Sequence, residues 1–364
     1  MRAVMIGGGV GGCAVAAALR GLSVARETVV VERRPKGAPA GMGFILMPNG
    51  LDALDAIAPE FDWRSAGRTI ERVLLCTAAG RVLDDQRIGA SVCVGRERFL
   101  GLLREATGAT EFHDEAAITG LVRRTDASTA AVELEGGRAI EGDLFFGCDG
   151  AQSRTRGILF PEARLGEVVV KEIVSVAHAP ALAARLGTSF HKFHDEEGGF
   201  AVGLLAESDE RVVWFVQYDS RRWPEVHGSA EGMARFVGER IAGWAPEVVE
   251  AYAATDFARS HLWPTRDLEP LASLSCRNLA LVGDAAHACL PFTSQGANGA
   301  LADAAILKEL LAGARSREDI ETAFARYTEC RRPHHRRMYI EGRRLREAFL
   351  APLSRSLPVV PLVG

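Results

Sequence analysis

The sequence predicts an α/β fold, with a Rossmann-like nucleotide-binding domain, an inserted and mostly antiparallel β-sheet, and C-terminal helices. Three observations predict it. A glycine turn, Gly7-x-Gly9-x-x-Gly12, separates an apolar run at 2–6 from an Ala-rich helical stretch at 12–22. A second apolar run at 28–32 completes a strand–turn–helix–strand opening. Between about 166 and 268 the segments alternate in polarity instead, which is typical of antiparallel strands.

These patterns divide the chain into two regions. The nucleotide-binding region is discontinuous and takes up 1–70, 96–165 and 269–364, and the sheet region, which we expect to bind substrate, takes up 71–95 and 166–268. Helical spacing is clear at 96–106 and 296–312, and the last 50 residues are helical and Arg-rich. The Gly/Pro-rich segment after Pro35 predicts a long functional loop, with mobile residues 41–50 and glycines 37, 41, 43 and 50 as hinges.

Composition excludes several function classes. Of the 364 residues 48% are apolar and 25% charged, which is typical of a soluble protein with a large core. A net charge of -4 argues against nucleic-acid binding, and no apolar run approaches the length of a membrane span. Glycines interrupt the N-terminal apolar run and no cleavage site follows it, which argues against a signal peptide. Seven scattered cysteines without CxxC spacing favour a reduced, cytoplasmic protein without a metal cluster.

Each residue of the glycine turn has a physical role. The first glycine allows a sharp turn, the second lets the backbone approach a pyrophosphate, and the third lets the helix pack on the strand. The helix N-terminus directs free N–H groups at the phosphates. Glu32 lies 20 residues after Gly12, where its carboxylate can accept both hydroxyls of a ribose. The motif therefore predicts a dinucleotide with a free 2′-OH, either FAD or NAD.

Later motifs choose between the two cofactors. Gly147-Cys-Asp149-Gly150 and Gly283-Asp284-Ala-Ala-His287 each follow a predicted strand. Three further patterns accompany them: Gly43…Pro48-Asn49-Gly50, Val94-x-Arg96-x-x-Phe99, and Pro291-x-x-x-Gln295-Gly296-x-Asn298-x-x-x-x-Asp303-Ala304. In this order they resemble the single-component FAD-dependent aromatic hydroxylases, the para-hydroxybenzoate hydroxylase-like group A monooxygenases, over nearly the whole chain.

The resemblance implies non-covalently bound FAD and a role for each matching residue. Glu32 would bind the adenosine ribose with Arg33 beside the ADP moiety, and Arg96 would reach the phosphates or the ribityl chain. Asp149 and Gly150 would help to hold the FAD and lie near the path of the nicotinamide. Asp284 would accept a ribityl hydroxyl. The segment with Pro291, Gly296, Ala297 and Asn298 would run beside the isoalloxazine ring, where a helix N-terminus favours negative charge.

The resemblance also implies a reaction. NADH or NADPH would bind transiently, since the sequence has no second glycine turn of this kind. Reduced flavin would react with O2 to a C4a-hydroperoxide that hydroxylates a small aromatic or electron-rich substrate. Another flavin oxidoreductase of the same fold, such as a polyprenyl reductase or an oxidase, and a non-catalytic carrier are the alternatives. A halogenase lacks support because the Trp-x-Trp-x-Ile-Pro signature is absent. The expected assembly is a monomer or a homodimer.

The substrate should lie between the flavin ring and the inserted sheet. One face of the strand at 212–218 would contact it, and Trp and Tyr on that face suit an aromatic ligand. The preferred contacts are Trp214, Val216 and Tyr218, together with Pro291 and Phe292, and the alternative face carries Val213, Phe215 and Gln217. Residues 288–298 include no carboxylate or histidine, so no catalytic base is assigned.

Two further features invite a functional interpretation. His287 resembles a structural histidine of the family, and His178, His191 and His194 do not form a metal site, because His191 and His194 would point to opposite faces of a strand. Ser294 stands where the family usually has glycine. If that position needs a positive φ, the serine strains the loop.

Overall fold

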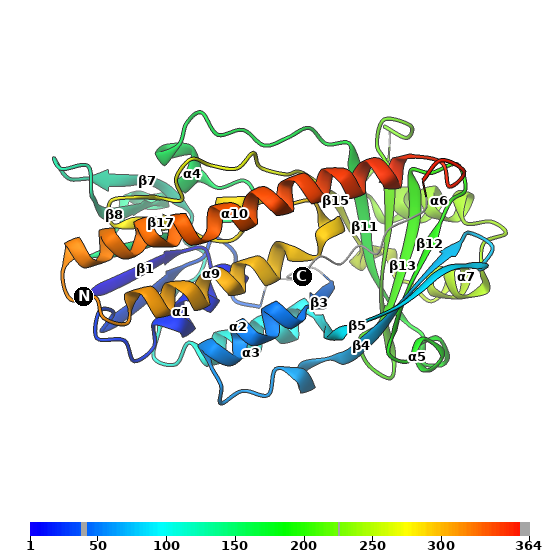
Figure 1. Cartoon of the computed structure of the whole chain (residues 1–364), viewed down its shortest axis with the longest axis horizontal. Helices are drawn as coiled ribbons and strands as arrows, with labels where there is room; N and C mark the ends of the chain where they lie inside the picture. Colours follow the sequence, from blue (N-terminus) through cyan, green and yellow to red (C-terminus); the bar gives the residue numbers. More distant parts are fainter. Residues whose placement is uncertain (38–41, 225, 357–364) are drawn as a thin grey trace.

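The computed structural model describes residues 1–37, 42–224 and 226–356. Its first layer is a six-stranded sheet in the order β16-β17-β10-β1-β2-β6 (Figure 1). All neighbours in it are parallel except β16 and β17, as in a nucleotide-binding sheet. Its strands are β1 (Arg2–Ile6), β2 (Glu27–Val31), β6 (Glu111–His113), β10 (Leu144–Gly147), β16 (Ser275–Cys276) and β17 (Leu279–Leu281).

Helices and a small sheet surround this layer. A three-stranded sheet is formed by β7 (Ile118–Arg123), β8 (Thr129–Leu134) and β9 (Ala139–Glu141). The helices of this region are α1 (Val10–Leu19), α2 (Pro48–Ile57), α3 (Arg96–Ala106), α4 (Arg154–Leu159), α8 (Asp284–His287), α9 (Gln295–Leu311) and α10 (Arg317–Leu350). Helix α1 is buried along nearly its whole length because alanines let it pack closely on β1.

The second large sheet has eight strands in the order β15-β11-β14-β13-β12-β4-β5-β3. It is antiparallel except for the pair β12–β4. Its strands are β3 (Gly43–Leu46), β4 (Arg68–Thr77), β5 (Val82–Gly95), β11 (Val170–His178), β12 (Ser189–His194), β13 (Phe200–Ala206), β14 (Arg211–Asp219) and β15 (His261–Pro264). Helices α5 (Pro180–Leu186), α6 (Ala230–Arg240) and α7 (Pro246–Ala253) cover one face.

The predicted mobile loop at 41–50 is wrong for most of its length. Residues 43–46 form the edge strand β3, and α2 begins at Pro48. A Cβ on Gly43 would crowd the β5 backbone, and one on Gly50 would clash with the Asn298 amide, so both glycines permit close packing. Gly37 has a positive φ, while Gly41 lies outside the described residues.

The two faces of β14 have different surroundings, which corrects the preferred substrate contacts. Trp214, Val216 and Tyr218 are fully buried in the apolar core under α5, α6 and α7. The Tyr218 ring, for example, lies 4.7 Å from the ring of Phe236 on α6. Side chains alternate along a strand, so Val213, Phe215 and Gln217 occupy the opposite face. That is the face which points toward the nucleotide-binding region, as the contacts of Lys192 described below show.

Helix α10 joins the two regions. It runs the length of the molecule, from the six-stranded sheet to the far end of the eight-stranded one (Figure 1). At one end Tyr327 donates to the backbone of β17, and at the other the Phe349 carbonyl accepts from Gly199 at 2.8 Å. Despite its 34 residues α10 is strongly polar, and none of the helices in the described ranges is long and apolar enough to cross a membrane.

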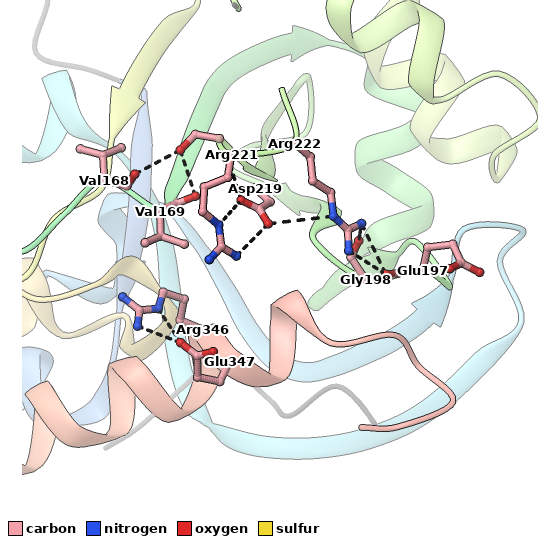
Figure 2. A network of polar contacts seen from close by, with 10 residues as sticks. Val168, Val169, Glu197, Gly198, Asp219, Arg221, Arg222, Arg346 and Glu347 are labelled. Atoms are coloured by element: carbon pink, nitrogen blue, oxygen red, sulfur yellow. Dashed lines mark hydrogen bonds and ion pairs between the residues drawn. The ribbon is translucent and has the colours of Figure 1, made fainter. Parts of the chain in front are cut away.

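A polar network fixes the turn beside the end of α10 (Figure 2). Asp219, at the end of β14, accepts two hydrogen bonds from the Arg221 guanidinium at 2.9 Å. Arg222 donates to the carbonyl of Gly198 at 2.8 Å, in the hairpin that contacts Phe349. Burial opposes ionisation of Asp219, but the hydrogen bonds and charge of Arg221 outweigh it and lower the pKa of Asp219. The network therefore fixes the hairpin whose backbone contacts α10 at Phe349.

Candidate active site

The glycine turn has the geometry that its sequence predicts. Gly7 has φ +110°, and a Cβ on it would clash with the Cys148 backbone of the neighbouring strand. A Cβ on Gly12 would clash with the carbonyl of Gly7. At Gly9, by contrast, a Cβ would meet no described protein atom within 4 Å. Two glycines are thus required by packing, while the space beside Gly9 suits a pyrophosphate at the α1 N-terminus.

Glu32 lies directly beside this turn. Its Oε2 accepts from the backbone N–H of Gly8 at 2.7 Å, and its Oε1 accepts from that of Arg34 at 2.9 Å. Each carboxylate oxygen retains a lone pair, which fits the two hydroxyls of a ribose. The predicted neighbour Arg33 is exposed, and Arg34 is the arginine that contacts Glu32, with 3.5 Å between Nε and Oε1. The sequence offered two adjacent arginines and no signal to choose between them.

Arg96 supports an anionic cofactor most directly. It begins α3, and its Nε is buried without a hydrogen-bond partner among the described residues. Burial lowers the pKa of its guanidinium, whereas the charge of Asp284 opposes this effect and that of Arg34 adds to it. The Nε without a partner and the nearby charge of Arg34 favour a negative group at this position, because a buried polar or charged group without a partner is costly. The diphosphate of FAD meets this need, so the residues present fit the cofactor.

The Asp149 carboxylate stabilises the turn between β10 and α4 through hydrogen bonds within the protein. It accepts from the Ser153 hydroxyl at 2.6 Å and from the backbone N–H and hydroxyl of Thr155 at 2.9 and 3.0 Å. Arg156 extends the link by donating to the carbonyl of Ala285 at 3.1 Å. Gly150 has φ +82° and open space at its Cβ position. A direct contact of Asp149 and Gly150 with FAD remains a prediction.

Behind the Asp284 turn lies a buried charged cluster. Asp303 is fully buried and accepts from His287 Nε2 at 2.6 Å, Arg331 Nε at 2.6 Å and Gly283 N at 2.9 Å. His287 is therefore a packed, hydrogen-bonded residue, as the sequence predicts. His335 Nε2 lies 3.7 Å from Asp303, so these three side chains could be mistaken for metal ligands. Arg331 already pairs with the Asp303 carboxylate, so we interpret the cluster as a buried ion-pair network of the protein.

The N-terminus of α9 carries the predicted strain. Ser294 has φ +54° and ψ +20°, the left-handed conformation that glycine adopts at low cost. Asn298 holds this turn against β3, because its amide donates to the carbonyls of Ile45 and Ser294 and accepts from Met47 N at 2.9 Å. The Asn298 side chain thus has a structural role, because it links the start of α9 to β3. Flavin contacts by Pro291, Gly296 and Ala297, which adjoin the start of α9, remain predictions.

The substrate side of the site contains a residue that sequence reasoning missed. Lys192, in the centre of β12, is only 2% exposed, and its Nζ lies 5.5 Å from the ring centre of Phe292. Phe292 belongs to the short helix η4 (Pro291–Thr293), directly before α9. The flavin-side loop and the inserted sheet therefore meet at Lys192. The available signal was a single lysine in the short strand SFHKFH, between two phenylalanines.

Comparisons with known proteins agree with this geometry. The model of the FAD binding domain family matches residues 1–341. A 3-amino-4-hydroxybenzoate 2-monooxygenase of Streptomyces platensis is 29% identical over 96% of this chain and 89% of its own length. An FAD-dependent urate hydroxylase of Mycolicibacterium vanbaalenii is 26% identical over 91% of this chain and 84% of its own.

Solved structures show the same fold. HpxO of Klebsiella pneumoniae, complexed with FAD and uric acid, has a TM-score of 0.85 at 21% identity and covers 98% of this chain and 90% of its own. PqsL of Pseudomonas aeruginosa, in complex with 2-aminobenzoylacetate, has a TM-score of 0.80 at 24% identity, with 96% of each chain covered. Because the family model matches nearly the whole chain, this protein belongs to the FAD binding domain family.

Proposed function

We propose that this protein is an FAD-dependent monooxygenase that uses NADH or NADPH and O2 to hydroxylate a small aromatic substrate. The observation that carries the proposal is the buried Nε of Arg96, which has no hydrogen-bond partner among the described residues and lies within the electrostatic field of Asp284 and Arg34. This arrangement favours an anionic group, and the FAD diphosphate would supply it. The related monooxygenase and hydroxylase described above support the type of reaction.

Different residues of the chain would bind different parts of the FAD. Glu32 would bind the adenosine ribose, Arg96 would neutralise the diphosphate, and Asp284 would accept a hydrogen bond from the ribityl chain. Bound FAD would supply the redox chemistry, taking two electrons from the nicotinamide and using them to activate O2. The α9 N-terminus would stabilise negative charge on the flavin ring, because its first N–H groups have no acceptor within the helix. The sheet and Phe292 would exclude water from the substrate.

The relatives indicate the size and shape of the substrate. The two curated enzymes are named for 3-amino-4-hydroxybenzoate and urate, and the HpxO structure contains uric acid. These compounds are small, planar and electron-rich, and a site of the same fold would suit a substrate of this class.

The test combines cofactor content with product analysis. The purified protein should be yellow, and a panel of hydroxylated benzoates and purines should be scored by NADH and NADPH oxidation and by product mass. A product heavier by one oxygen atom supports the proposal, whereas peroxide release without product does not. Arg96→Met should lower the FAD content, and Arg98→Met, which removes an exposed arginine of the same helix, is the control. Colourless protein that cannot be reconstituted with FAD would contradict the proposal.

We also propose a cytoplasmic location and a monomeric or homodimeric state. All seven cysteines are free thiols, including the exposed Cys330. Free thiols persist in reducing compartments. Thiol labelling of the freshly isolated protein and light scattering after size-exclusion chromatography would test the two parts of this proposal separately.

A further inference from the structure

Lys192 is a buried cation without an anion in contact with it among the residues that the structure describes. Its Nζ lies between two aromatic rings, 5.9 Å from the centre of Phe215 and 5.5 Å from that of Phe292. No carboxylate of the described residues lies within ion-pair distance, since Glu172 acts on it only through its longer-range field. Cation–π contacts offset only part of the cost of burying an ammonium group. The described residues therefore leave the ammonium group without a counter-charge, which a bound anion could supply.

The register of the strands around Lys192 brings an aromatic ring close to the ammonium group. Lys192 pairs with Gly203 on β13, and Gly203 pairs in turn with Phe215 on β14. A Cβ on Gly203 would clash with the Phe215 ring. Glycine thus lets the ring lie across the β13 backbone toward the ammonium group. An aromatic wall and a cation are brought together by the register of three adjacent strands.

Further polar groups on the same face also lack partners. Gln217 donates to Glu172 Oε1 at 2.6 Å, but its own Oε1 is buried without a hydrogen bond among the described residues. His194 follows Lys192 by two residues on the same face, and its Nε2 is likewise buried and without a partner. Buried polar atoms normally have a hydrogen-bond partner. These two atoms and the Lys192 ammonium, which contacts Phe292, lie on one face of the sheet and together suit a polar, flat ligand.

We propose that Lys192 binds the ionised oxygen of the substrate, a carboxylate or phenolate on a planar ring that packs against Phe215 and Phe292. Gln217 and His194 would meet further polar atoms of that ring. This inference rests on the proposed function, because it takes the compound bound here to be the one that is hydroxylated. It assigns a specificity residue to β12 of the inserted sheet, whereas the contacts predicted from the sequence lay on β14.

The charge state of Lys192 agrees with this role. Burial lowers the pKa of its ammonium to about 8, and the field of Glu172 opposes this lowering. Burial and the charge of Lys192 together keep the pKa of the nearby His194 well below its usual value, so that His194 is neutral. The ammonium is therefore the positive group of this face at neutral pH, and a bound anion would raise its pKa.

One experiment reads this effect directly. The chain contains only four lysines, at positions 36, 171, 192 and 308, so the holoenzyme labelled with 13C at lysine Cε gives a simple spectrum. Lys192→Met identifies the signal. In a pH titration the Lys192 signal should have its midpoint near 8 without ligand and a higher one with saturating 3-hydroxybenzoate or 4-nitrophenol. An unchanged midpoint with both compounds would overturn the proposal.

A second experiment compares charged and neutral probes by calorimetry with the same holoenzyme. The pair 3-hydroxybenzoate and 3-hydroxybenzamide tests a carboxylate, and the pair 4-nitrophenol and nitrobenzene tests a phenolate at mildly alkaline pH. The charged member of at least one pair should bind more tightly, and Lys192→Met should weaken it by about 10- to 100-fold. Lys171→Met is the matched control, because Lys171 belongs to β11 of the same sheet and pairs with Tyr218, so that its side chain lies on the opposite face.

The outcomes separate this inference from the proposed function. The inference would be overturned if both members of each pair bind with equal affinity or show no measurable binding. It would also be overturned if the preference for the charged compound persists in Lys192→Met. Neither result depends on turnover. FAD content and product mass test the monooxygenase activity independently, so an active enzyme without a charge preference would refute only the role of Lys192.

Discussion

Replacing Asp303 with asparagine should be among the most damaging single changes in the nucleotide-binding region. The carboxylate is fully buried between the Arg331 guanidinium and His287, each at 2.6 Å. An asparagine would keep the volume but leave the buried arginine without a counter-charge. Removing one partner of such a pair costs about 3–5 kcal/mol. An unfolding entropy of about 2.1 cal/mol/K per residue over 364 residues converts this to a fall in Tm of about 4–7 °C.

Thermal unfolding of the FAD-loaded protein would measure this loss. Asp85→Asn, which breaks an exposed ion pair with Arg72, is the control and should cost less than about 1 kcal/mol. The double variant Asp303→Asn/Arg331→Met should lose less than the sum of the single variants, because removing both charges leaves neither unpaired. A Tm no lower than that of Asp85→Asn, or an additive double variant, would refute the reasoning.

The same variant gives a pH test with a defined sign. Burial opposes ionisation of Asp303, but the charges of His287 and Arg331 outweigh it and keep the pKa of Asp303 well below its usual value. A depressed carboxyl pKa stabilises the fold above the unfolded-state pKa, which is about 3.9 for aspartate. The difference in free energy of unfolding between wild type and Asp303→Asn should therefore have its largest value at neutral pH and decrease below about pH 4.

Three further predictions concern the cofactor and substrate sides of the site. Gly12→Ala should lose FAD and unfold at lower temperature because its Cβ clashes with Gly7, whereas Gly9→Ala should fold normally and lose only FAD affinity, as fluorescence titration would show. Tyr218→Phe should leave KM unchanged and raise the free energy of unfolding by up to about 1 kcal/mol, because the hydroxyl is buried without a hydrogen-bond partner among the described residues. A higher KM would instead indicate that the face of β14 with Trp214 and Tyr218 contacts the substrate. Wild-type affinity for 3-hydroxybenzoate should be constant below about pH 8 and fall above it as Lys192 loses its proton, and calorimetry should show no such fall in Lys192→Met.

The cofactor side of the site could be predicted from the sequence because its determinants are local. Gly7 and Gly12 are required by backbone contacts within one strand–turn–helix unit, and Ser294 does adopt the positive φ that a glycine position predicts. The resemblance to FAD-dependent hydroxylases is confirmed by the family match.

The substrate side was harder to predict because its determinants are long-range. Alternation along β14 gives two possible faces, and only the packing of α5–α7 shows that Trp214 and Tyr218 belong to the core. The Gly/Pro-rich segment resembled a loop because β3 has only four residues and pairs with β5, 50 residues away. Lys192 is distinguished by its contact with Phe292, 100 residues later in the chain, which no local pattern reveals.

Helix α10 has a consequence for how the molecule loses its structure. Its 34 residues span about 50 Å, and along this length it contacts the six-stranded sheet through Tyr327, the buried cluster through Arg331 and the eight-stranded sheet through Phe349. Neither sheet can open without breaking contacts to the same helix. We therefore expect cooperative unfolding, in which backbone amides of β1 and β14 exchange with deuterium at similar rates. Binding of FAD should then slow exchange in the distant sheet as well.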